Sequence, residues 1–499
     1  MKKSKLFIGA LAALLTGGAG YGQVKVPRLI SDGMVLQREI PIRIWGWASP
    51  GEKITVKFGG ETVSGETDDR GKWQVVLSPK KAGGPYVMDI NGINHIWLKN
   101  IMVGEVWVCS GQSNMELPME RVKEKYPEII AHSENTAIRQ FRVPQKYDFN
   151  TPHDNLPGAK WESASPETIG SFSAVAYFFA RELNEHYHVP VGLITAAVGG
   201  TPDEAWLSAD ALRSFPGYAA EAGRYADSNY VNSVLAGGMT DEHVSPQTVV
   251  RSKPMGLYNG MIAPLTNYTI RGVIWYQGEA NVSRAKEYQI SFPALINDWR
   301  RHWNEGIFPF LFVQLAGYGP VKDKPEESQI ALLREAQRMA LVLPKTGMAV
   351  AMDLGDSNDI HPLNKEDVGK RLALSAEHVA YDAGDMIWTG PLYHSMKIKG
   401  ERVHIIFKEA DRGLIVKGGG ELHGFEIAGA DNHFVPAKAV IDGKNVVIVS
   451  SDAVPHPTVV RYAWADNPVG ANLYNRDILF HDGLPAPSFE ARPKEPKGK

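Results

Sequence analysis

The sequence predicts an α/β protein: a parallel sheet flanked by helices, with an N-terminal and a C-terminal β-rich region on either side of it in the chain. In the central part, short apolar runs alternate with amphipathic helical patterns, which is typical of a parallel sheet covered by helices. Before and after it, β-branched or aromatic runs are separated by turns that contain Gly, Pro or Asp. Such spacing is typical of antiparallel strands.

The individual elements follow from the apolar pattern. The strands expected in the central sheet are residues 106–109, 191–197, 272–276, 310–315 and 348–352, and the helices between them include 173–183 and 328–341. Strands expected in the flanking regions, of which the first resembles a small sandwich, are 40–45, 53–58, 73–77, 402–407, 445–449 and 458–462. Residues 208–255 have weak periodicity, so we expect an inserted helical segment or a cover near the site.

These elements divide the chain into regions. We expect a signal peptide (1–22), an N-terminal sandwich-like domain (23–102), the α/β domain (103–395), a C-terminal β-rich region (396–490) and a disordered Lys- and Pro-rich tail (491–499). The signal peptide is predicted by a basic start, a short apolar run and small residues. Because that run is too short to span a bilayer, we expect an exported protein, periplasmic or secreted, without a membrane span.

Composition excludes some classes of partner. The 499 residues carry 53 Lys+Arg and 56 Asp+Glu, a net charge of −3, and no long basic run, so nucleic acid is not an expected partner. The single cysteine, Cys109, excludes a Cys-based zinc site and a disulfide. No set of His and acidic residues has metal-ligand spacing, so neither a metal nor an organic cofactor is expected.

A nucleophilic serine is the first candidate for chemistry. Gly111-Gln112-Ser113-Asn114 directly follows a strand-like run. A serine on a turn at a strand end is exposed and has its own backbone N–H nearby, as a nucleophile requires. The turn is not the Gly-x-Ser-x-Gly elbow, because Met115 stands at the second glycine position.

Three further segments also follow predicted strands: Gly199-Gly200-Thr201, residues 277–281 (Gln-Gly-Glu-Ala-Asn) and residues 359–362 (Asp-Ile-His-Pro). The carboxyl ends of parallel strands share one edge of the sheet, where ligands bind. His361 is the candidate general base, and the N–H groups of Ser113 and Gly200 with the Asn281 amide are candidate oxyanion donors. Taken singly, these segments could be a tight turn, a surface carboxylate or a helix-start histidine; the ordered set favours catalysis.

The order of these motifs resembles the SGNH hydrolases, and within them the sialate O-acetylesterase family, whose relatives include acetylxylan esterases of carbohydrate esterase family 6. The similarity extends from about residue 26 to 489, with blocks at 35–37, 107–116, 199–206, 257–261, 275–281, 333–337 and 360–365. It implies a serine esterase with Ser113 as nucleophile, His361 as base, and Ser113, Gly200 and Asn281 as the oxyanion hole.

The sequence does not decide which acidic residue would orient His361. The family pattern places Asp three residues before the His, but that position is Asn358, which carries no charge. Asp359 is the nearest acid, and Glu279 is an equal rival because some related acetylxylan esterases use the acid of the Gln-Gly-Glu motif. Asp353 and Asp356 are weaker candidates.

The expected reaction is hydrolysis of a carbohydrate O-acetyl ester through an acetyl-Ser113 intermediate. O-acetylated sialic acid is the favoured substrate, acetylxylan or another glycan is the alternative, and a non-catalytic glycan-binding protein is the third hypothesis. Gln112 and Arg334 are substrate-binding candidates; Arg251 and Arg284 are also near the motifs, and an Arg can bind the carboxylate of a sialic acid. The sequence leaves the oligomeric state open.

Overall fold

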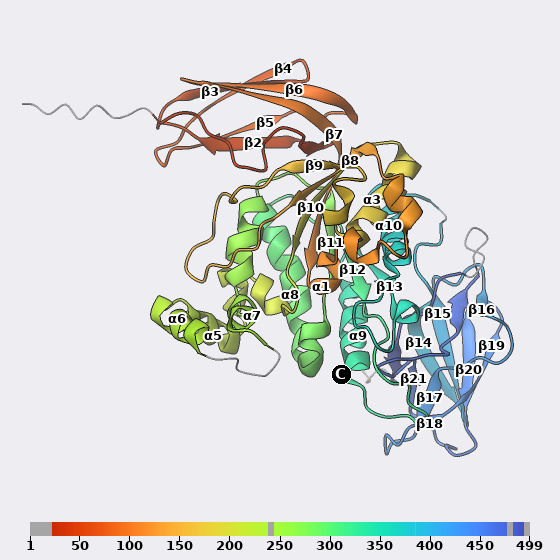
Figure 1. Ribbon diagram of the computed structural model, residues 1–499. Coiled ribbons are helices and arrows are strands. Elements are labelled where there is room, and N and C mark those ends of the chain that lie inside the picture. The colour runs from red at the N-terminus through yellow and green to blue at the C-terminus, as the bar shows by residue number, and fades with distance from the viewer. Residues whose placement is uncertain (1–21, 238–243, 385, 477–482, 494–499) are drawn as a thin grey trace, which may run out of the picture.

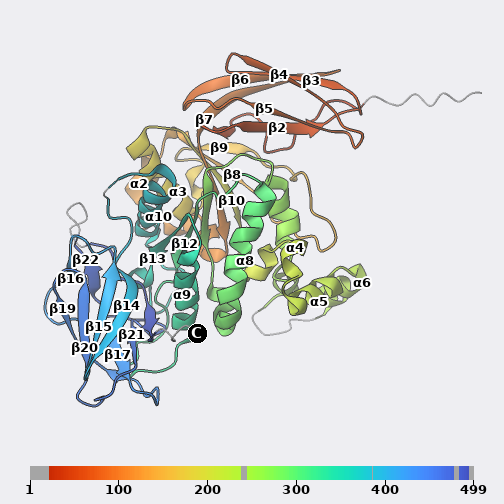
Figure 2. The same ribbon diagram turned by 180° about the vertical axis from the view of Figure 1, so that it is seen from behind.

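The computed structural model describes residues 22–237, 244–384, 386–476 and 483–493. The expected signal peptide, apart from its last residue, and positions 494–499 of the expected tail lie outside the described residues. The chain forms a helix-flanked central sheet, with the N-terminal strands at one end and the C-terminal sheets at one side (Figures 1 and 2). Among the described residues, no helix is long and apolar enough to cross a membrane.

The central sheet has the strand order β13-β12-β11-β7-β10-β8-β9 and is parallel except for β9. Every residue of β10 to β13 is buried, as expected for strands covered on both faces. The strands are β7 (His95–Gly111), β8 (Asn135–Arg142), β9 (Trp161–Ala164), β10 (Val191–Ala197), β11 (Gly272–Tyr276), β12 (Phe310–Gln314) and β13 (Thr346–Val350). The expected α/β class with a parallel sheet and flanking helices is confirmed.

Four long helices flank this sheet (Figure 1). They are α3 (Ala174–Tyr187), which packs against α10 (Lys365–Tyr381), and α8 (Ala285–Trp303), which packs against α9 (Gln329–Met339). Ser173 caps α3 by accepting the N–H of Ala176, and Ser328 caps α9 in the same way, so each helix begins at a side chain suited to that position.

Strand β7 belongs to two sheets. Its first part pairs with β6 and β1 in the N-terminal region, and its last part lies between β10 and β11 at the centre of the main sheet. Glu105 in this strand is buried and forms ion pairs with Arg38 and Arg271. The boundary expected at 102/103 therefore falls inside one continuous strand.

The N-terminal region is antiparallel apart from β1, which runs parallel to β7. Alternate residues of β5 are buried, which is the pattern of a strand with one face on the core. Its strands are β1 (Val35–Gln37), β2 (Ile42–Trp47), β3 (Lys53–Phe58), β4 (Glu61–Glu66), β5 (Lys72–Leu77) and β6 (Gly83–Asn91).

The C-terminal region contains three antiparallel sheets. Their strands are β14 (Leu392–Lys399), β15 (Arg402–Lys408), β16 (Leu414–Val416), β17 (Phe425–Ala428), β18 (Val435–Pro436), β19 (Lys438–Asp442), β20 (Val446–Ser450), β21 (Val459–Tyr462), β22 (Leu473–Asn475) and β23 (Phe489–Ala491). Residue 491, which the sequence placed in the tail, pairs with Val460 in the last sheet. The region is fastened to the central domain by Asp353, which binds Arg371 and accepts the hydroxyl of Tyr474.

Residues 208–255 include four helices, α4 (Ala209–Leu212), α5 (Pro216–Tyr225), α6 (Ser228–Ala236) and α7 (Pro246–Arg251). They project from the sheet beside α8 and have a small apolar cluster of their own around Phe149, Tyr225 and Val250 (Figure 1). The remaining short helices are α1 (Ser113–Glu116), η1 (Met119–Val122), α2 (Pro127–Ala131), η2 (Ile169–Ser171), η3 (Asp203–Trp206), η4 (Tyr258–Ile262), η5 (Ala263–Leu265), η6 (Glu279–Arg284), η7 (Ala340–Val342) and η8 (Met352–Leu354).

Candidate active site

Ser113 stands where the central strand β7 turns into the short helix α1. Gly111 closes the strand with φ 133°, and a Cβ there would lie 2.2 Å from the main-chain oxygen of Tyr276, so only glycine fits. Gln112 N–H donates to the same oxygen over 3.0 Å. The turn is thereby fixed against β11, and Ser113, the first residue of α1, is only partly buried.

His361 lies within hydrogen-bond distance of this serine. Its Nε2 is 2.8 Å from Ser113 Oγ, the geometry in which the neutral imidazole accepts the hydroxyl proton. Burial lowers the pKa of His361 below its usual value, although the charge of Asp359 opposes this shift. The imidazole is therefore held neutral near pH 7, as a general base must be.

The peptide unit before His361 is held at both of its polar atoms. The N–H of His361 donates to Asp359 Oδ1 over 2.8 Å, and the oxygen of Ile360 accepts from the side-chain amide of Asn114 over 3.0 Å. Because Asn114 follows Ser113 in the chain, the turn that carries the nucleophile also holds the loop that carries the base.

Asp359 is the acid that faces the imidazole. Its Oδ1 lies 3.7 Å from His361 Nδ1, longer than a hydrogen bond, and its Oδ2 lies 3.3 Å from Nη2 of Arg121. Glu279 instead accepts the amide of Asn114 through Oε1 over 2.5 Å. Of the two acids left open by the sequence, the geometry favours Asp359.

The two weaker candidates for the acid, Asp353 and Asp356, have other contacts. Asp356 Oδ1 accepts the N–H of Asn358, and Asp353 binds the Arg371 guanidinium with both oxygens over 2.6 and 2.8 Å. Each is thus engaged in holding a loop or a helix.

Two backbone N–H groups are available next to the serine. In the part of the chain that the structure describes, neither Ser113 N–H nor Gly200 N–H has a hydrogen-bond partner. Gly200 has φ 75°, which favours glycine, and the neighbouring Gly199 N–H donates to Glu116 Oε2 over 2.7 Å. A Cβ on Gly199 would lie 3.4 Å from Ser113 Cβ, so this turn packs directly on the serine.

Asn281 is placed differently from the expectation that it donates to an oxyanion. Its side chain is fully buried, and its Nδ2 donates to Asp203 Oδ1 over 2.8 Å and to Glu204 Oε2 over 3.1 Å. Its Oδ1 accepts from Asp203 N and from Gln277 Nε2. Both amide hydrogens of Asn281 are therefore engaged with carboxylates, and the side chain connects the 277–281 segment to Asp203 and Glu204.

Burial also argues against the two substrate-binding candidates. Arg334 is fully buried, and its guanidinium donates to the main-chain oxygens of Leu315, Ala316, Ala465 and Asp466. It thus fastens α9 to the C-terminal region and is not open to a sugar. Gln112 is 3% exposed, and its Oε1 accepts the N–H of Ala280 over 3.1 Å, so its amide oxygen holds η6.

The other two arginines have protein partners too. Arg284 binds Glu204 over 2.6 Å, and Arg251 donates to the main-chain oxygen of Gly199 over 3.1 Å. Arg251 therefore connects α7 to the Gly-Gly turn beside the serine.

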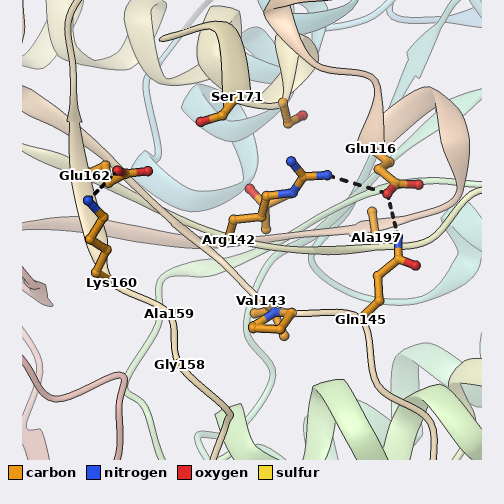
Figure 3. A pocket seen from close by; sticks show the side chains of 13 residues that line it. Glu116, Arg142, Val143, Gln145, Gly158, Ala159, Lys160, Glu162, Ser171 and Ala197 are labelled. Carbon is orange, nitrogen blue, oxygen red and sulfur yellow. Dashed lines mark hydrogen bonds and ion pairs between the residues drawn. The ribbon is translucent and has the colours of Figure 1, made fainter. Parts of the chain in front are cut away.

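A polar hollow of about 410 Å³ lies next to the Gly199 turn (Figure 3). Glu116, from the same short helix as Ser113, lines the hollow and accepts a hydrogen bond from Gln145 Nε2 over 2.7 Å. Arg142, at the end of β8, points across the hollow with Nη2 3.7 Å from Glu116 Oε1, and its side chain is half exposed. Lys160 and Glu162 pair on the far side over 2.9 Å.

Sequence reasoning missed Glu116 and Arg142. Glu116 lies inside the motif block 107–116, and Arg142 ends β8, a strand that the sequence did not predict, so neither position alone indicated a hollow. Among the described residues, no group of three or more His, Cys, Asp or Glu is placed to hold a metal ion.

A parallel sheet with a Ser–His pair at its carboxyl edge defines the class of serine hydrolases. A family model described as carbohydrate esterase, sialic acid-specific acetylesterase, matches residues 103–234 and 241–377. The chain belongs to this family of carboxylic ester hydrolases.

Known relatives extend the match over nearly the whole chain. Human sialate O-acetylesterase is 30% identical over 95% of this chain and 93% of its own length, and the rat sialate O-acetylesterase is 30% identical over 98% and 97%. The crystal structure of a carbohydrate acetylesterase from Xanthomonas citri is similar with a TM-score of 0.82 and 39% identity, covering 94% of this chain and 99% of that one.

Proposed function

We propose that this chain is a serine esterase that removes O-acetyl groups from carbohydrates, with O-acetylated sialic acid as substrate, through an acetyl-Ser113 intermediate. The observation that carries the proposal is the 2.8 Å contact between Ser113 Oγ and His361 Nε2, next to two unengaged N–H groups. The named activity of the sialate O-acetylesterases and of the Xanthomonas carbohydrate acetylesterase supports the same reaction.

The reaction has two halves. In the first, His361 Nε2 takes the Ser113 proton while Oγ attacks the acetyl carbonyl, and the N–H groups of Ser113 and Gly200 receive the oxyanion. The tetrahedral intermediate collapses, the bond to the sugar oxygen breaks, and His361 returns its proton to that oxygen. In the second half, His361 takes a proton from water, which attacks the acetyl-serine; acetate leaves and Ser113 regains its proton.

Asp359 takes the role of the acid in this scheme. A negative charge 3.7 Å from Nδ1 stabilises the imidazolium that forms in both halves. At this distance the carboxylate acts on the imidazolium through its charge and not through a hydrogen bond.

The hollow next to Arg142 favours a substrate sugar that carries a carboxylate. Arg142 is half exposed, and its contact with Glu116 is a long one of 3.7 Å, which leaves guanidinium donors for a ligand. An arginine can receive a carboxylate through two parallel hydrogen bonds. The hollow is lined by residues at the ends of β8 and β10 and by Glu116, which belongs to the same short helix as Ser113.

The test is acetate release by the purified mature protein from O-acetylated sialic acid and from acetylated xylan, with Ser113→Ala as control. Release from the sialic acid that requires Ser113 supports the whole proposal. Release mainly from xylan keeps the chemistry and overturns the substrate. The absence of Ser113-dependent release from both, and from an aryl acetate, would leave the glycan-binding alternative.

We also propose that the protein is exported, and that residues 1–22 are its signal peptide. A basic start followed by a short apolar run and small residues supports this. N-terminal sequencing of protein from a cell that exports it should find a chain that starts near Gln23; a chain that still begins at Met1 contradicts the proposal.

A further inference from the structure

Beneath the Ser–His pair lies a buried lysine that the reaction scheme does not use. Lys365, the first residue of α10, is fully buried, and its Nζ donates to Asn114 Oδ1 over 2.5 Å. The same ammonium lies 5.3 Å from the ring centroid of Tyr276, a favourable cation–π distance. Burying a cation costs free energy unless hydrogen bonds or nearby charges compensate, so the contacts of Lys365 show what holds it there.

The contact with Lys365 determines how the Asn114 amide is turned. An ammonium group has donors only, so it can contact the amide through its oxygen and not through its nitrogen. The NH2 group is then directed at Glu279 Oε1, over 2.5 Å, and at the main-chain oxygen of Ile360, over 3.0 Å. Asn114 is 1% exposed, so water does not compete for these contacts.

We propose that Lys365 is a positioning residue that acts through Asn114: its ammonium group fixes the amide, and the amide holds the Ile360–His361 peptide so that the imidazole meets Ser113. The inference rests on the proposed esterase function and adds a residue to it. A neutral amine can also accept a hydrogen bond, so it no longer prevents the amide from turning over. The position of His361 therefore depends on the charge of Lys365.

The charged groups around Lys365 make that charge sensitive to pH. Burial lowers its pKa to about 7, and the carboxylates of Glu279 and Asp359 oppose the shift. His361 is the other titrating group nearby, and Lys365 contributes to lowering its pKa. Activity should therefore rise as His361 loses its proton and fall above pH of about 7 as Lys365 loses its own.

The first test compares Lys365→Met with Lys370→Met, a matched change on the solvent-exposed side of the same helix. Lys370 pairs with Glu366 over 3.0 Å and is one third exposed. Lys365→Met should lower kcat for acetate release by about 10- to 100-fold with little change in KM, the effect of misplacing a catalytic group by about 1 Å. Lys370→Met should leave kcat unchanged.

The pH profile separates positioning from packing. In Lys365→Met the fall of kcat above neutral pH should disappear, and in Lys365→Arg it should move to higher pH because a guanidinium stays protonated. If Lys365→Met or Lys365→Arg retains kcat and the alkaline fall of the natural chain, the proposal is overturned. The Arg variant gives this readout even if the Met variant does not fold.

A double-mutant cycle tests the route through Asn114. If Lys365 acts through this amide, adding Lys365→Met to Asn114→Ala should lower kcat no further than Asn114→Ala alone. Additive losses would show that Lys365 acts by another route and would overturn the proposal. Ser113→Ala, measured in parallel, distinguishes this failure from failure of the esterase function, because activity that survives in that variant contradicts the function itself.

Discussion

Asn114 and Ile360 are joined by a hydrogen bond of 3.0 Å from the side-chain amide to the main-chain oxygen. Asn114 follows Ser113 and Ile360 precedes His361, so this bond connects the turn of the nucleophile to the loop of the base across almost 250 residues of sequence. Asp359 holds the N–H of the same peptide over 2.8 Å. The alignment of Ser113 with His361 therefore depends on main-chain contacts as well as on the two side chains.

The first prediction concerns the acid. Asp359→Asn should lower kcat for acetate release by about 100-fold, because the imidazolium loses its neighbouring charge. Glu279→Gln should lower kcat by less than about 10-fold. The new glutamine can still accept the Asn114 hydrogen bond through its side-chain oxygen, and position 279 makes no contact with His361. A large loss in Glu279→Gln alone would assign the role to Glu279, and small losses in both would leave a Ser–His dyad.

The same variant has a predicted pH signature. The charge of Asp359 raises the pKa of His361, which burial otherwise lowers. Removing that charge in Asp359→Asn should lower the pKa and move the acidic limb of the kcat/KM profile to lower pH. A limb that stays in place would show that Asp359 does not act on His361.

The second prediction concerns Asn281. Because its amide hydrogens bind Asp203 and Glu204, Asn281→Ala should leave buried carboxylate oxygens unpaired and lower the free energy of unfolding by about 1–3 kcal/mol. Its effect on kcat of the folded enzyme should stay below about 10-fold, whereas loss of an oxyanion donor typically costs about 100- to 1000-fold. Thermal unfolding and kcat, measured on one sample, distinguish a structural role of Asn281 from a role as oxyanion donor. A loss of kcat of about 100-fold at unchanged stability would show that Asn281 is an oxyanion donor.

The third prediction concerns substrate recognition. Arg142→Gln should raise KM for O-acetylated sialic acid by about 10-fold or more, since a charge-assisted bidentate contact is lost. KM for an aryl acetate, which has no carboxylate, should not change. Arg213→Gln, at an exposed arginine directly after α4, is the matched control. An equal rise of KM for both substrates in Arg142→Gln would contradict the prediction that Arg142 binds the carboxylate of the sugar.

The fourth prediction concerns the contact between domains. Arg334→Met should leave four main-chain oxygens without their donor and lower the free energy of unfolding by about 3 kcal/mol or more. Arg338→Met, on the same helix, removes an ion pair with Glu335 and a contact with the Tyr393 ring but no hydrogen bond to a main-chain oxygen, so it should lower the free energy of unfolding by less. Calorimetry measures both; if Arg334→Met leaves Tm unchanged, Arg334 does not fasten the C-terminal region.

The sequence predicted the strands well and the contacts poorly. Strand 191–197 coincides with β10, and 272–276 with β11, because fully buried parallel strands appear as short apolar runs. The strand expected at 348–352 lies at Thr346–Val350, because two small or polar residues begin it and do not mark an apolar run. The single strand β7 was not foreseen, because its exposed first half and buried second half have different patterns.

The site shows the same limit. The motif order placed Ser113, Gly200 and His361 on one edge of the sheet; in the structure His361 contacts Ser113, and Gly199, the neighbour of Gly200, packs on the same serine. Arg334 and Asn281 lie in quoted motif blocks too, but their partners are main-chain oxygens and carboxylates from distant segments. Which partner a polar side chain finds depends on the packing of the whole domain, and spacing along the chain does not contain that information.

The most direct test of the account is labelling of the mature protein with a fluorophosphonate, followed by peptide mass spectrometry. An activated serine reacts with this reagent, whereas an ordinary turn serine does not. We expect one adduct, on Ser113, that disappears in Ser113→Ala and forms much more slowly in His361→Ala. No adduct, or an adduct on a different serine, would contradict the assignment of Ser113 as the nucleophile.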